Sequence, residues 1–271
     1  MTTGDHRPPL QADVIRGGLV NFWRRLDIVP DTGSTNADML GRSAAGEEID
    51  GSVLVADYQR AGRGRHGRAW YAPARSQIAV SVGVNADAVP TEAWGWLPLL
   101  TGVAVVDAVR EISGIAAGLK WPNDVLVGCE KLAGILAEVA APAPVIVVGI
   151  GLNVTLTKQE APDPVATSLL LLGSPTLDRN LLLCRILREL ATRIDTWQSQ
   201  RGAGPQLVAD YERLSMTLGR NVRAGLPGDR QIVGVARSVD ELGRLRIDTG
   251  SHLVTVSAGD ITHLRPLNDD G

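Results

Sequence analysis

The chain has 271 residues, of which 44% are hydrophobic and 21% charged, and its net charge is −3. This length and composition predict a soluble globular protein with one large and one small domain, and they exclude a disordered chain. The acidic balance argues against binding to nucleic acid through a broad basic surface. Cys129 and Cys184 form no CxxC pair and the four histidines are scattered, so neither a disulfide framework nor a structural metal is expected.

The N-terminal residues 1–18 have the composition of a loose leader or a short helix. They leave no room for a helix-turn-helix DNA-binding module. We find no secretory signal and no long apolar run, which predicts a cytoplasmic protein without a membrane span.

A polar turn follows the first predicted strand, 22–29. It holds Ser34, Thr35 and Asn36 directly before a helical pattern, at the position where side-chain oxygens cap a helix. Capping needs only one of the three side chains. The others are then available to a polar ligand, and both interpretations stay open from these residues alone.

The second predicted strand, 51–59, leads into a segment rich in arginine and glycine. Four arginines, three glycines and one histidine fall within the nine positions from Arg60 to Arg68, and no acidic residue lies between Asp57 and Arg75. Alternating glycines disfavour helix and strand, so this Arg-Gly loop should be mobile when it is empty. Its guanidinium and N–H groups can enclose a phosphate or a carboxylate, and the alternative is an ordinary solvated loop.

The residues on either side of the Arg-Gly loop are predicted as follows. Gln59 is either a sheet-edge residue or an amide that binds a ligand. Trp70 either stacks on a base or anchors the loop to the core, and the anchor is the favoured interpretation. Residues 77–84 alternate as in a half-buried antiparallel strand. Residues 91–112 predict the main core helix, with Pro98 near its first turn.

A Lys-Trp-Pro-Asn-Asp motif, Lys120–Asp124, ends the next predicted strand. A hairpin follows, and its second arm runs from Lys131 to Val139. Lys131 is therefore either a solvated hairpin lysine or a cation aimed at a ligand.

An apolar strand begins at Val145 and closes with Gly149 and Gly151. This glycine pair fails the dinucleotide-binding fingerprint, because the third glycine and the following helix are missing. The simpler interpretation is that the glycines let another group approach the strand backbone closely.

The remaining third of the chain predicts a loop-rich link at 155–175 and helices at 177–198 and 204–216. From Thr217 the sequence changes to short apolar strands separated by glycine turns, which predicts a small β-barrel. We therefore expect a catalytic domain at 1–217 and a barrel domain at 218–271.

Four motifs thus occur in order: Ser34–Asn36; Gln59 with the Arg-Gly loop; Lys120–Asp124 with Lys131–Leu136; and Gly149–Asn153. This series resembles the biotin–protein ligases, also called biotin–[acetyl-CoA-carboxylase] ligases, in a form without an N-terminal DNA-binding domain. The resemblance extends from about Asp27 to Asn153. The Arg-Gly loop and the Lys-Trp-Pro-Asn-Asp motif are both specific to it.

The resemblance implies an α+β fold, with a mixed or antiparallel sheet and flanking helices in a class II synthetase-like catalytic domain, followed by a small C-terminal SH3-like β-barrel. It also implies two half-reactions. Biotin's carboxylate attacks the α-phosphate of ATP to give biotinyl-5′-adenylate and pyrophosphate. A lysine of a biotin carrier domain, such as that of acetyl-CoA carboxylase, then attacks the adenylate. Mg²⁺ would accompany ATP, and neither nucleic acid nor membrane is an expected partner.

Roles for individual residues follow from the resemblance by motif. The implied catalytic residues are Lys131, Arg65 and Asp124. The implied biotin contacts are Ser34, Thr35, Asn36, Gln59, Arg63, Gly64, Arg65, Lys131 and Gly134. The implied contacts to ATP or the adenylate are Arg63, Arg65, Arg68, Trp70, Asn123, Lys131, Gly149, Gly151 and Asn153. Mg²⁺ would be held through the ATP phosphates, with Asp124 as the candidate protein ligand.

The chemistry of this reaction agrees with the residue types. Joining a carboxylate to ATP brings two anions together, so the catalytic demand is charge neutralisation and alignment. The acyl adenylate is labile in water, and a loop that orders around an anion would protect it. His66 and Ala69 depart from the pattern, since some family members have arginine and lysine there; the loop has fewer positive charges as a result.

Three rival interpretations remain. A lipoate–protein ligase has a related fold and also adenylates a carboxylate, although the Arg-Gly loop resembles the biotin branch. A nucleic-acid-binding Arg-Gly protein is disfavoured by the acidic balance and the single arginine cluster. A biotin-binding module without catalytic activity is disfavoured by the presence of Lys131.

Overall fold

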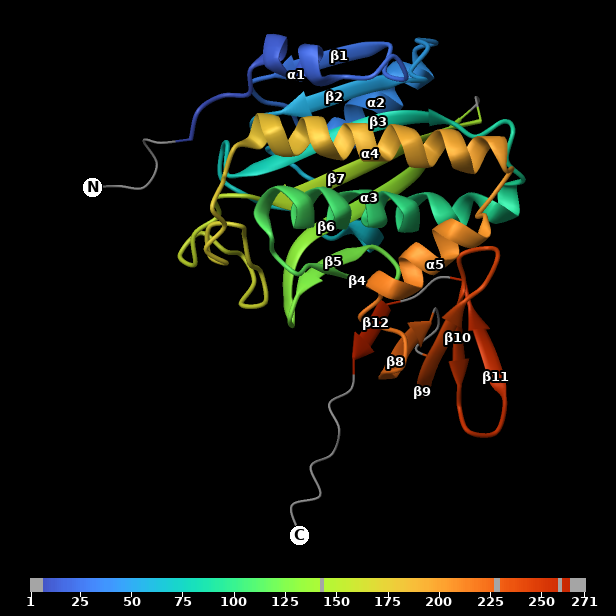
Figure 1. The fold of residues 1–271 in the computed structure, drawn as a ribbon. Helices are drawn as coiled ribbons and strands as arrows, with labels where there is room; N and C mark the ends of the chain where they lie inside the picture. Colours follow the sequence, from blue (N-terminus) through green and yellow to red (C-terminus); the bar gives the residue numbers. More distant parts are fainter. Residues whose placement is uncertain (1–6, 142–143, 227–229, 258–259, 264–271) are drawn as a thin grey trace.

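The computed structural model describes residues 7–141, 144–226, 230–257 and 260–263. They form a large sheet flanked by helices and a smaller sheet at the C-terminal end (Figure 1). The elements of the larger unit are α1 (Ala12–Gly18), β1 (Arg25–Val29), α2 (Thr35–Ala44), β2 (Ser52–Ala56), η2 (Arg65–Gly67), β3 (Gln77–Asn85), η3 (Thr91–Gly95), α3 (Trp96–Ser113), β4 (Gly118–Lys120), β5 (Asp124–Val127), β6 (Glu130–Ala140), β7 (Val145–Asn153), α4 (Arg179–Ser199) and α5 (Pro205–Leu214).

The large sheet has seven strands in the order β1-β2-β3-β7-β6-β5-β4. Only β1 and β2 pair in parallel, and every other neighbouring pair is antiparallel. Strand β7 lies in the middle, between β3 and β6, and β5 and β6 form the predicted hairpin. The α+β fold with a mixed sheet and flanking helices is confirmed.

Alternate residues of β2 show that both faces of this sheet are covered. Val53 and Val55 belong to the large core with α3 and α4, whereas Leu54 packs with Met39 of α2 on the opposite face. Figure 1 shows α3 and α4 lying across one face of the sheet. The prediction that residues 77–84 are half-buried is wrong for this reason. Strand β3 is buried on both faces, and even the polar residue Ser81 is fully buried.

The predicted core helix is confirmed and is preceded by a short 3-10 helix. Pro98 lies in the first turn of α3, where its missing N–H removes no helical hydrogen bond, and α3 ends before Gly114, whose φ is 70°. The helical stretch Thr91–Ser113 is long and apolar enough to cross a membrane, but 72% of its most apolar part is buried inside the protein. It is the central core helix of this fold.

The smaller sheet corresponds to the predicted C-terminal barrel. Its strands are β8 (Asn221–Leu226), β9 (Arg230–Val239), β10 (Leu245–Asp248), β11 (Leu253–Val256) and β12 (Asp260–His263), in the antiparallel order β11-β10-β9-β8-β12. Strand β12 was not predicted. Two buried indoles of the larger unit hold this sheet: Trp121 Nε1 donates to the Gly243 carbonyl at 3.0 Å, and Trp96 Nε1 donates to the Asp240 carbonyl at 3.1 Å.

Candidate active site

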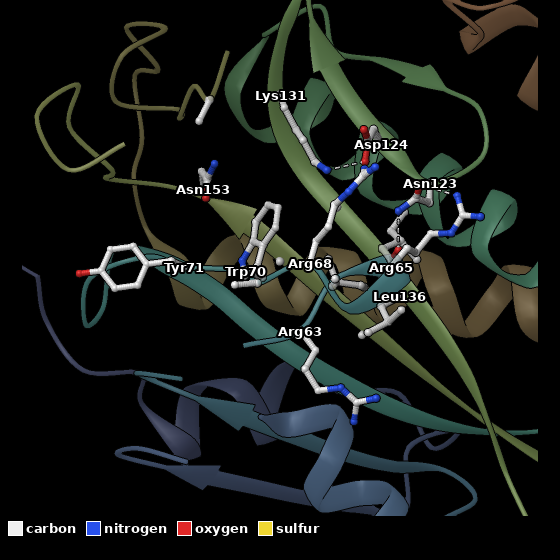
Figure 2. Close-up of a pocket in the computed structure, with 18 of the residues that line it drawn as sticks. Arg63, Arg65, Arg68, Trp70, Tyr71, Asn123, Asp124, Lys131, Leu136 and Asn153 are labelled. Carbon is white, nitrogen blue, oxygen red and sulfur yellow. Dashed lines mark hydrogen bonds and ion pairs between the residues drawn. The ribbon is translucent and has the colours of Figure 1, made fainter. Parts of the chain in front are cut away.

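A cavity of about 490 Å³ opens on the α2 face of the large sheet. Every residue that the motifs marked as a site candidate lines this cavity (Figure 2); these are Ser34, Thr35, Asn36, Gln59, Arg63, Gly64, Arg65, Arg68, Trp70, Asn123, Asp124, Lys131, Gly134, Gly149, Gly151 and Asn153. The fold therefore brings four separate motifs together around one space.

The polar turn forms one end of the cavity and does more than cap α2. Ser34 is the N-cap and its hydroxyl accepts a hydrogen bond from the N–H of Ala37 at 3.5 Å. Gln59 Oε1 accepts from both the N–H and the hydroxyl of Thr35, at 2.9 and 3.0 Å. Thr35, Asn36 and Gln59 are all buried, so this end presents a fixed set of polar groups.

Two residues that support this end were missed in the sequence. Ser81 Oγ lies 2.7 Å from Thr35 Oγ1 and 2.6 Å from Asn36 Oδ1, and Glu138 accepts from Asn36 Nδ2 at 2.9 Å. Both residues lie on apolar strands and belong to no motif. Their polar side chains inside otherwise apolar patterns were the available signal.

Three strand glycines form the floor of the cavity. A Cβ on Gly149 would lie 2.2 Å from Asn36 Oδ1, and one on Gly151 would lie 2.5 Å from the Trp70 indole. Gly134 is the cross-strand partner of Gly151 and lies under the same ring. The prediction that Gly149 and Gly151 allow close approach to the strand backbone is confirmed, and the approaching groups are Asn36 and Trp70.

Trp70 lies flat against this floor and is held at its edge. Its Nε1 donates to Gln77 Oε1 at 2.6 Å, and the Lys131 ammonium lies 5.4 Å from its ring centroid. The ring is thus an internal wall of the cavity as well as the anchor that the sequence predicted.

Lys131 and Asp124 face each other across the hairpin (Figure 2). Lys131 Nζ lies 2.6 Å from Asp124 Oδ1, with the side chains 32% and 20% exposed. The backbone of Lys131 is held separately: its N–H donates to Val165 O at 2.6 Å and its carbonyl accepts from Thr167 N at 2.9 Å. An ammonium held in this way can bridge two anions, and Lys131 is no freely solvated hairpin lysine.

Asn123 connects the hairpin to the Arg-Gly loop. Arg65 Nη1 donates to Asn123 Oδ1 at 3.2 Å, while Asn123 Nδ2 donates to Ile135 O at 2.9 Å. Asn153, at the opposite wall, donates to Thr167 O at 2.9 Å and leaves its buried Oδ1 without a hydrogen-bond partner in the described chain. That oxygen is an acceptor available to a ligand.

The Arg-Gly loop is more regular than predicted. Residues 65–67 form a short 3-10 turn that His66 and Gly67 permit with φ values of 55° and 72°, and Gly64 N donates to Arg68 O at 2.7 Å across it. These φ values are not those of a regular right-handed helix, so the expectation that the loop forms neither helix nor strand holds apart from this single three-residue turn. Distant acids supply the missing counter-charges: Arg60 pairs with Asp31, and Arg63 Nη2 lies 2.5 Å from Glu138.

The charge of the cavity is strongly positive. Five cationic side chains line it, against the carboxylates of Asp124 and Asp163; the cations are Arg63, Arg65, Arg68, Lys120 and Lys131. Arg63 points away from Lys131 and Asp124 (Figure 2), so the cations are spread along the cavity. Across the described ranges, no group of three or more His, Cys, Asp or Glu residues is placed to hold a metal.

The cavity also has walls that the sequence did not indicate. The link 155–175 contributes Pro162, Asp163, Val165 and Ala166, and β12 of the small sheet contributes Ile261. Lys120 and Tyr71 line it as well. The link carried no motif beyond its prolines, and nothing in the C-terminal strands indicated that they reach the site.

An ion pair fixes the start of that link. Arg7 Nη2 donates to Glu160 Oε2 and to the Thr155 carbonyl, both at 2.7 Å. The hydrogen bond from Arg7, followed by those from Thr157, lowers the pKa of Glu160 from 4.5 to about 2 against the opposing effect of burial. Glu160 is therefore ionised at every pH at which the protein is expected to work.

Comparison with known proteins agrees with this geometry. The Biotin/lipoate A/B protein ligase family matches residues 33–154, and the Biotin protein ligase C terminal domain matches residues 217–264. The fold and the cavity thus define a protein of the biotin and lipoate ligase class.

Individual relatives narrow this class. The biotin–[acetyl-CoA-carboxylase] ligase of Mycobacterium tuberculosis is 54% identical over 98% of this chain and 100% of its own. The bifunctional ligase/repressor BirA of Escherichia coli is 31% identical over 87% of this chain and 73% of its own. The solved biotin protein ligase from Aquifex aeolicus, in complex with biotin and ATP, superposes with a TM-score of 0.76 at 27% identity, covering 90% of this chain and all of that one. The chain belongs to the biotin–protein ligase family.

Proposed function

We propose that the protein activates biotin with ATP and transfers it to a lysine of a biotin carrier domain, such as that of acetyl-CoA carboxylase. In the first step a biotin carboxylate oxygen bonds to the α-phosphorus, the bond to the bridging oxygen breaks, and pyrophosphate leaves. In the second step the neutral lysine amine attacks the acyl carbon, AMP leaves with the bonding electron pair, and the amine loses a proton. No enzyme nucleophile takes part.

One observation carries this proposal: a single cavity has buried neutral polar groups at one end and cations along the rest. Biotin has a neutral ureido head and an anionic tail, and ATP adds further negative charge. Gln59 and the Thr35 hydroxyl offer the first kind of group, and Lys131 beside Asp124 offers the second. Charge neutralisation is the main catalytic demand when two anions react.

The biotin end follows from this polarity. We assign Ser34, Thr35, Asn36 and Gln59 to the ureido head, because their fixed donors and acceptors suit a neutral polar ring. The carboxylate end then falls near Arg63, Gly64 and Gly134. Lys131 would lie between carboxylate and α-phosphate, and Asp124 would hold its ammonium until the substrates arrive.

The adenylate end occupies the rest of the cavity. Arg65 and Arg68 would neutralise phosphate oxygens, and Asn123 would orient Arg65 toward them. Asn153 offers its free Oδ1 to the nucleotide, while Gly149 and Gly151 leave room over the sheet and Trp70 supplies an aromatic face. Mg²⁺ fits this site only as an ion carried by the ATP phosphates, with Asp124 as the nearest protein carboxylate, since Mg²⁺ commonly binds through one or two carboxylates and substrate phosphates.

The location, the partners and the domain division complete the proposal. We propose a cytoplasmic location, no nucleic-acid or membrane partner, and a division into domains at 1–217 and 218–271. The last helix of the larger unit ends at Leu214 and the first strand of the smaller begins at Asn221, which supports the division.

Transfer to a carrier domain tests the function. Purified protein, biotin, ATP and Mg²⁺ are incubated with a biotin carrier domain, and covalent biotin is detected by streptavidin blotting and intact mass. The expected product gains one biotin, and a carrier with its acceptor lysine replaced by arginine gains none. Absence of labelling on the intact carrier, or equal labelling of both carriers, would contradict the proposal.

A further inference from the structure

Arg179 lies outside the cavity but contacts Asp57 and Gln77, the two residues that flank the segment 58–76 in which the Arg-Gly loop lies. It is the first residue of α4, follows the N-cap Asp178, and is only 5% exposed. An arginine this deeply buried is unusual and calls for a partner that compensates its lost hydration.

Its guanidinium joins three separate stretches of chain. Nη2 donates to Asp57 Oδ1 at 2.9 Å and to the Pro8 carbonyl at 2.6 Å, and Nη1 donates to the Gln77 carbonyl at 3.2 Å. Asp57 directly follows β2, and Gln77 is the first residue of β3. One side chain therefore connects the two stems of the segment 58–76.

A second arginine completes the closure of these stems. Arg75 N donates to the Asp57 carbonyl at 2.7 Å, and Arg75 Nε lies 3.2 Å from Asp57 Oδ2. Arg75 has a φ of 60° and its side chain is 44% exposed, whereas Arg179 binds from the inside. Burial lowers the pKa of Arg179 and the adjacent Asp57 carboxylate opposes that shift, so the guanidinium remains charged.

The two stems carry residues of the site itself. Gln77, whose carbonyl Arg179 binds, accepts from Trp70 Nε1 through its side chain at 2.6 Å. Gln59, two residues beyond Asp57, accepts from the Thr35 N–H at 2.9 Å. Fixing the stems thus fixes an aromatic wall and a polar end of the cavity at once.

We propose that Arg179 is a positioning residue for the Arg-Gly loop, holding both of its stems so that the loop can close over the adenylate. This inference rests on the proposed function, in which the loop retains the intermediate. A lysine cannot replace it fully, because one ammonium does not reproduce a planar fork that binds three acceptors in separate segments.

The test compares three variants of the full chain. Arg179→Met removes the charge and the fork, and Arg179→Lys keeps the charge alone. Arg193→Met is the matched control: Arg193 is also an arginine of α4, its side chain is 17% exposed, and it pairs with Asp107 at 2.5 Å and Asp210 at 3.1 Å on neighbouring helices. Within the described chain its ion pairs join α4 to α3 and α5 and do not involve the loop stems, so it reports the cost of losing an inter-helix ion pair alone.

Hydrogen exchange on the unliganded proteins is the first measurement. Arg179→Met should raise exchange in peptides covering 58–76 by about tenfold or more while the peptides of β6 and β7 stay near wild type. Arg193→Met should leave 58–76 unchanged, and Arg179→Lys should lie between. If Arg179→Met does not fold, Arg179→Lys carries the comparison. The proposal would be overturned if segment 58–76 exchanged at the wild-type rate in a folded Arg179 variant. It would also be overturned if Arg193→Met raised exchange in that segment equally.

Retention of the intermediate is the second measurement. Adenylate formed from radiolabelled biotin is chased with unlabelled biotin, and its release is followed by filtration. Arg179→Met should release it about tenfold faster, with a smaller change in the rate of its formation, and Arg193→Met should match wild type. Equal release from all variants would overturn the proposal. If the proposed function is wrong, the wild-type protein will form no adenylate. Hydrogen exchange would then still test whether Arg179 positions the loop.

Discussion

At Gly151 the missing side chain determines the shape of the cavity floor. An added Cβ would meet the Trp70 ring at 2.5 Å, so the ring would have to lift from the sheet. The sequence predicted that Gly151 lets another group approach the strand backbone closely. It did not identify Trp70 as the group above Gly151, because that contact joins residues 81 positions apart and depends on the register of β6 and β7.

We therefore predict that Gly151→Ala weakens nucleotide binding. The displaced Trp70 should narrow the adenylate end and raise the KM for ATP by about tenfold, with a smaller effect on the KM for biotin. Steady-state pyrophosphate release measures both constants. Gly41→Ala in α2 is the control, because its added Cβ meets nothing within 4 Å; it should leave both constants unchanged. An unchanged KM for ATP in Gly151→Ala would show that Trp70 does not border the nucleotide.

Lys131 gives a second prediction at this scale. Lys131→Ala should reduce the rate of adenylate formation by at least about a hundredfold, because it removes the cation placed between the reacting anions. Its side chain is 32% exposed and contributes little to the core, so the melting temperature should change by only a few degrees. Quenched-flow measurement of adenylate is the assay, and Lys158→Ala, a 56% exposed lysine, is the control. Near-normal formation in Lys131→Ala would remove this residue from the mechanism.

Among the elements, the link 155–175 differs most from its sequence-based description. It was predicted as a connection, yet it forms a cavity wall and binds the backbone of Lys131. The strands and helices themselves were predictable, since apolar periodicity reflects burial on one or two faces. The position of the link was not, because it depends in part on hydrogen bonds to distant residues such as Arg7 and Lys131.

The Arg7–Glu160 pair makes this element sensitive to acid. The pKa of Glu160 is about 2 in the folded protein against an ordinary 4.5, so ionised Glu160 stabilises the fold above pH 4.5 and that contribution is lost as pH falls toward 2. We predict that Glu160→Gln lowers the free energy of unfolding by the same amount at pH 6 and pH 8, and by less at pH 3. Urea denaturation monitored by tryptophan fluorescence measures the difference.

Glu48→Gln is the control for this prediction. Glu48 forms an exposed surface ion pair with Arg24, and such pairs contribute about 0–1 kcal/mol. Its replacement should change stability little at any of these pH values. A Glu160→Gln effect that is as large at pH 3 as at pH 6 would show that the pair does not lower the carboxyl pKa.

At the scale of the whole molecule, the two sheets share one continuous core. Val222 and Leu245 of the small sheet belong to the same buried cluster as Val80 and Leu100 of the large unit. Trp121, inside the Lys-Trp-Pro-Asn-Asp motif, donates to Gly243, so the motif that carries Asn123 and Asp124 is attached to both units. The sequence indicated two domains but contained no sign of this contact, because it joins distant residues through a side chain and a backbone carbonyl.

We predict that both units unfold together. Scanning calorimetry of the unliganded protein should show one transition whose calorimetric and van't Hoff enthalpies agree, because the shared core leaves neither sheet independent. Two resolved transitions would show that the C-terminal sheet is a separate folding unit.

We propose that this cavity joins biotin, and not lipoate, to the α-phosphate of ATP. ATP–pyrophosphate exchange measures that step directly and needs no carrier protein, because radiolabelled pyrophosphate enters ATP only when the adenylate forms reversibly. We predict strong exchange with biotin and background exchange with lipoate at equal concentrations. Exchange stimulated by lipoate and not by biotin, or by neither acid, would contradict it.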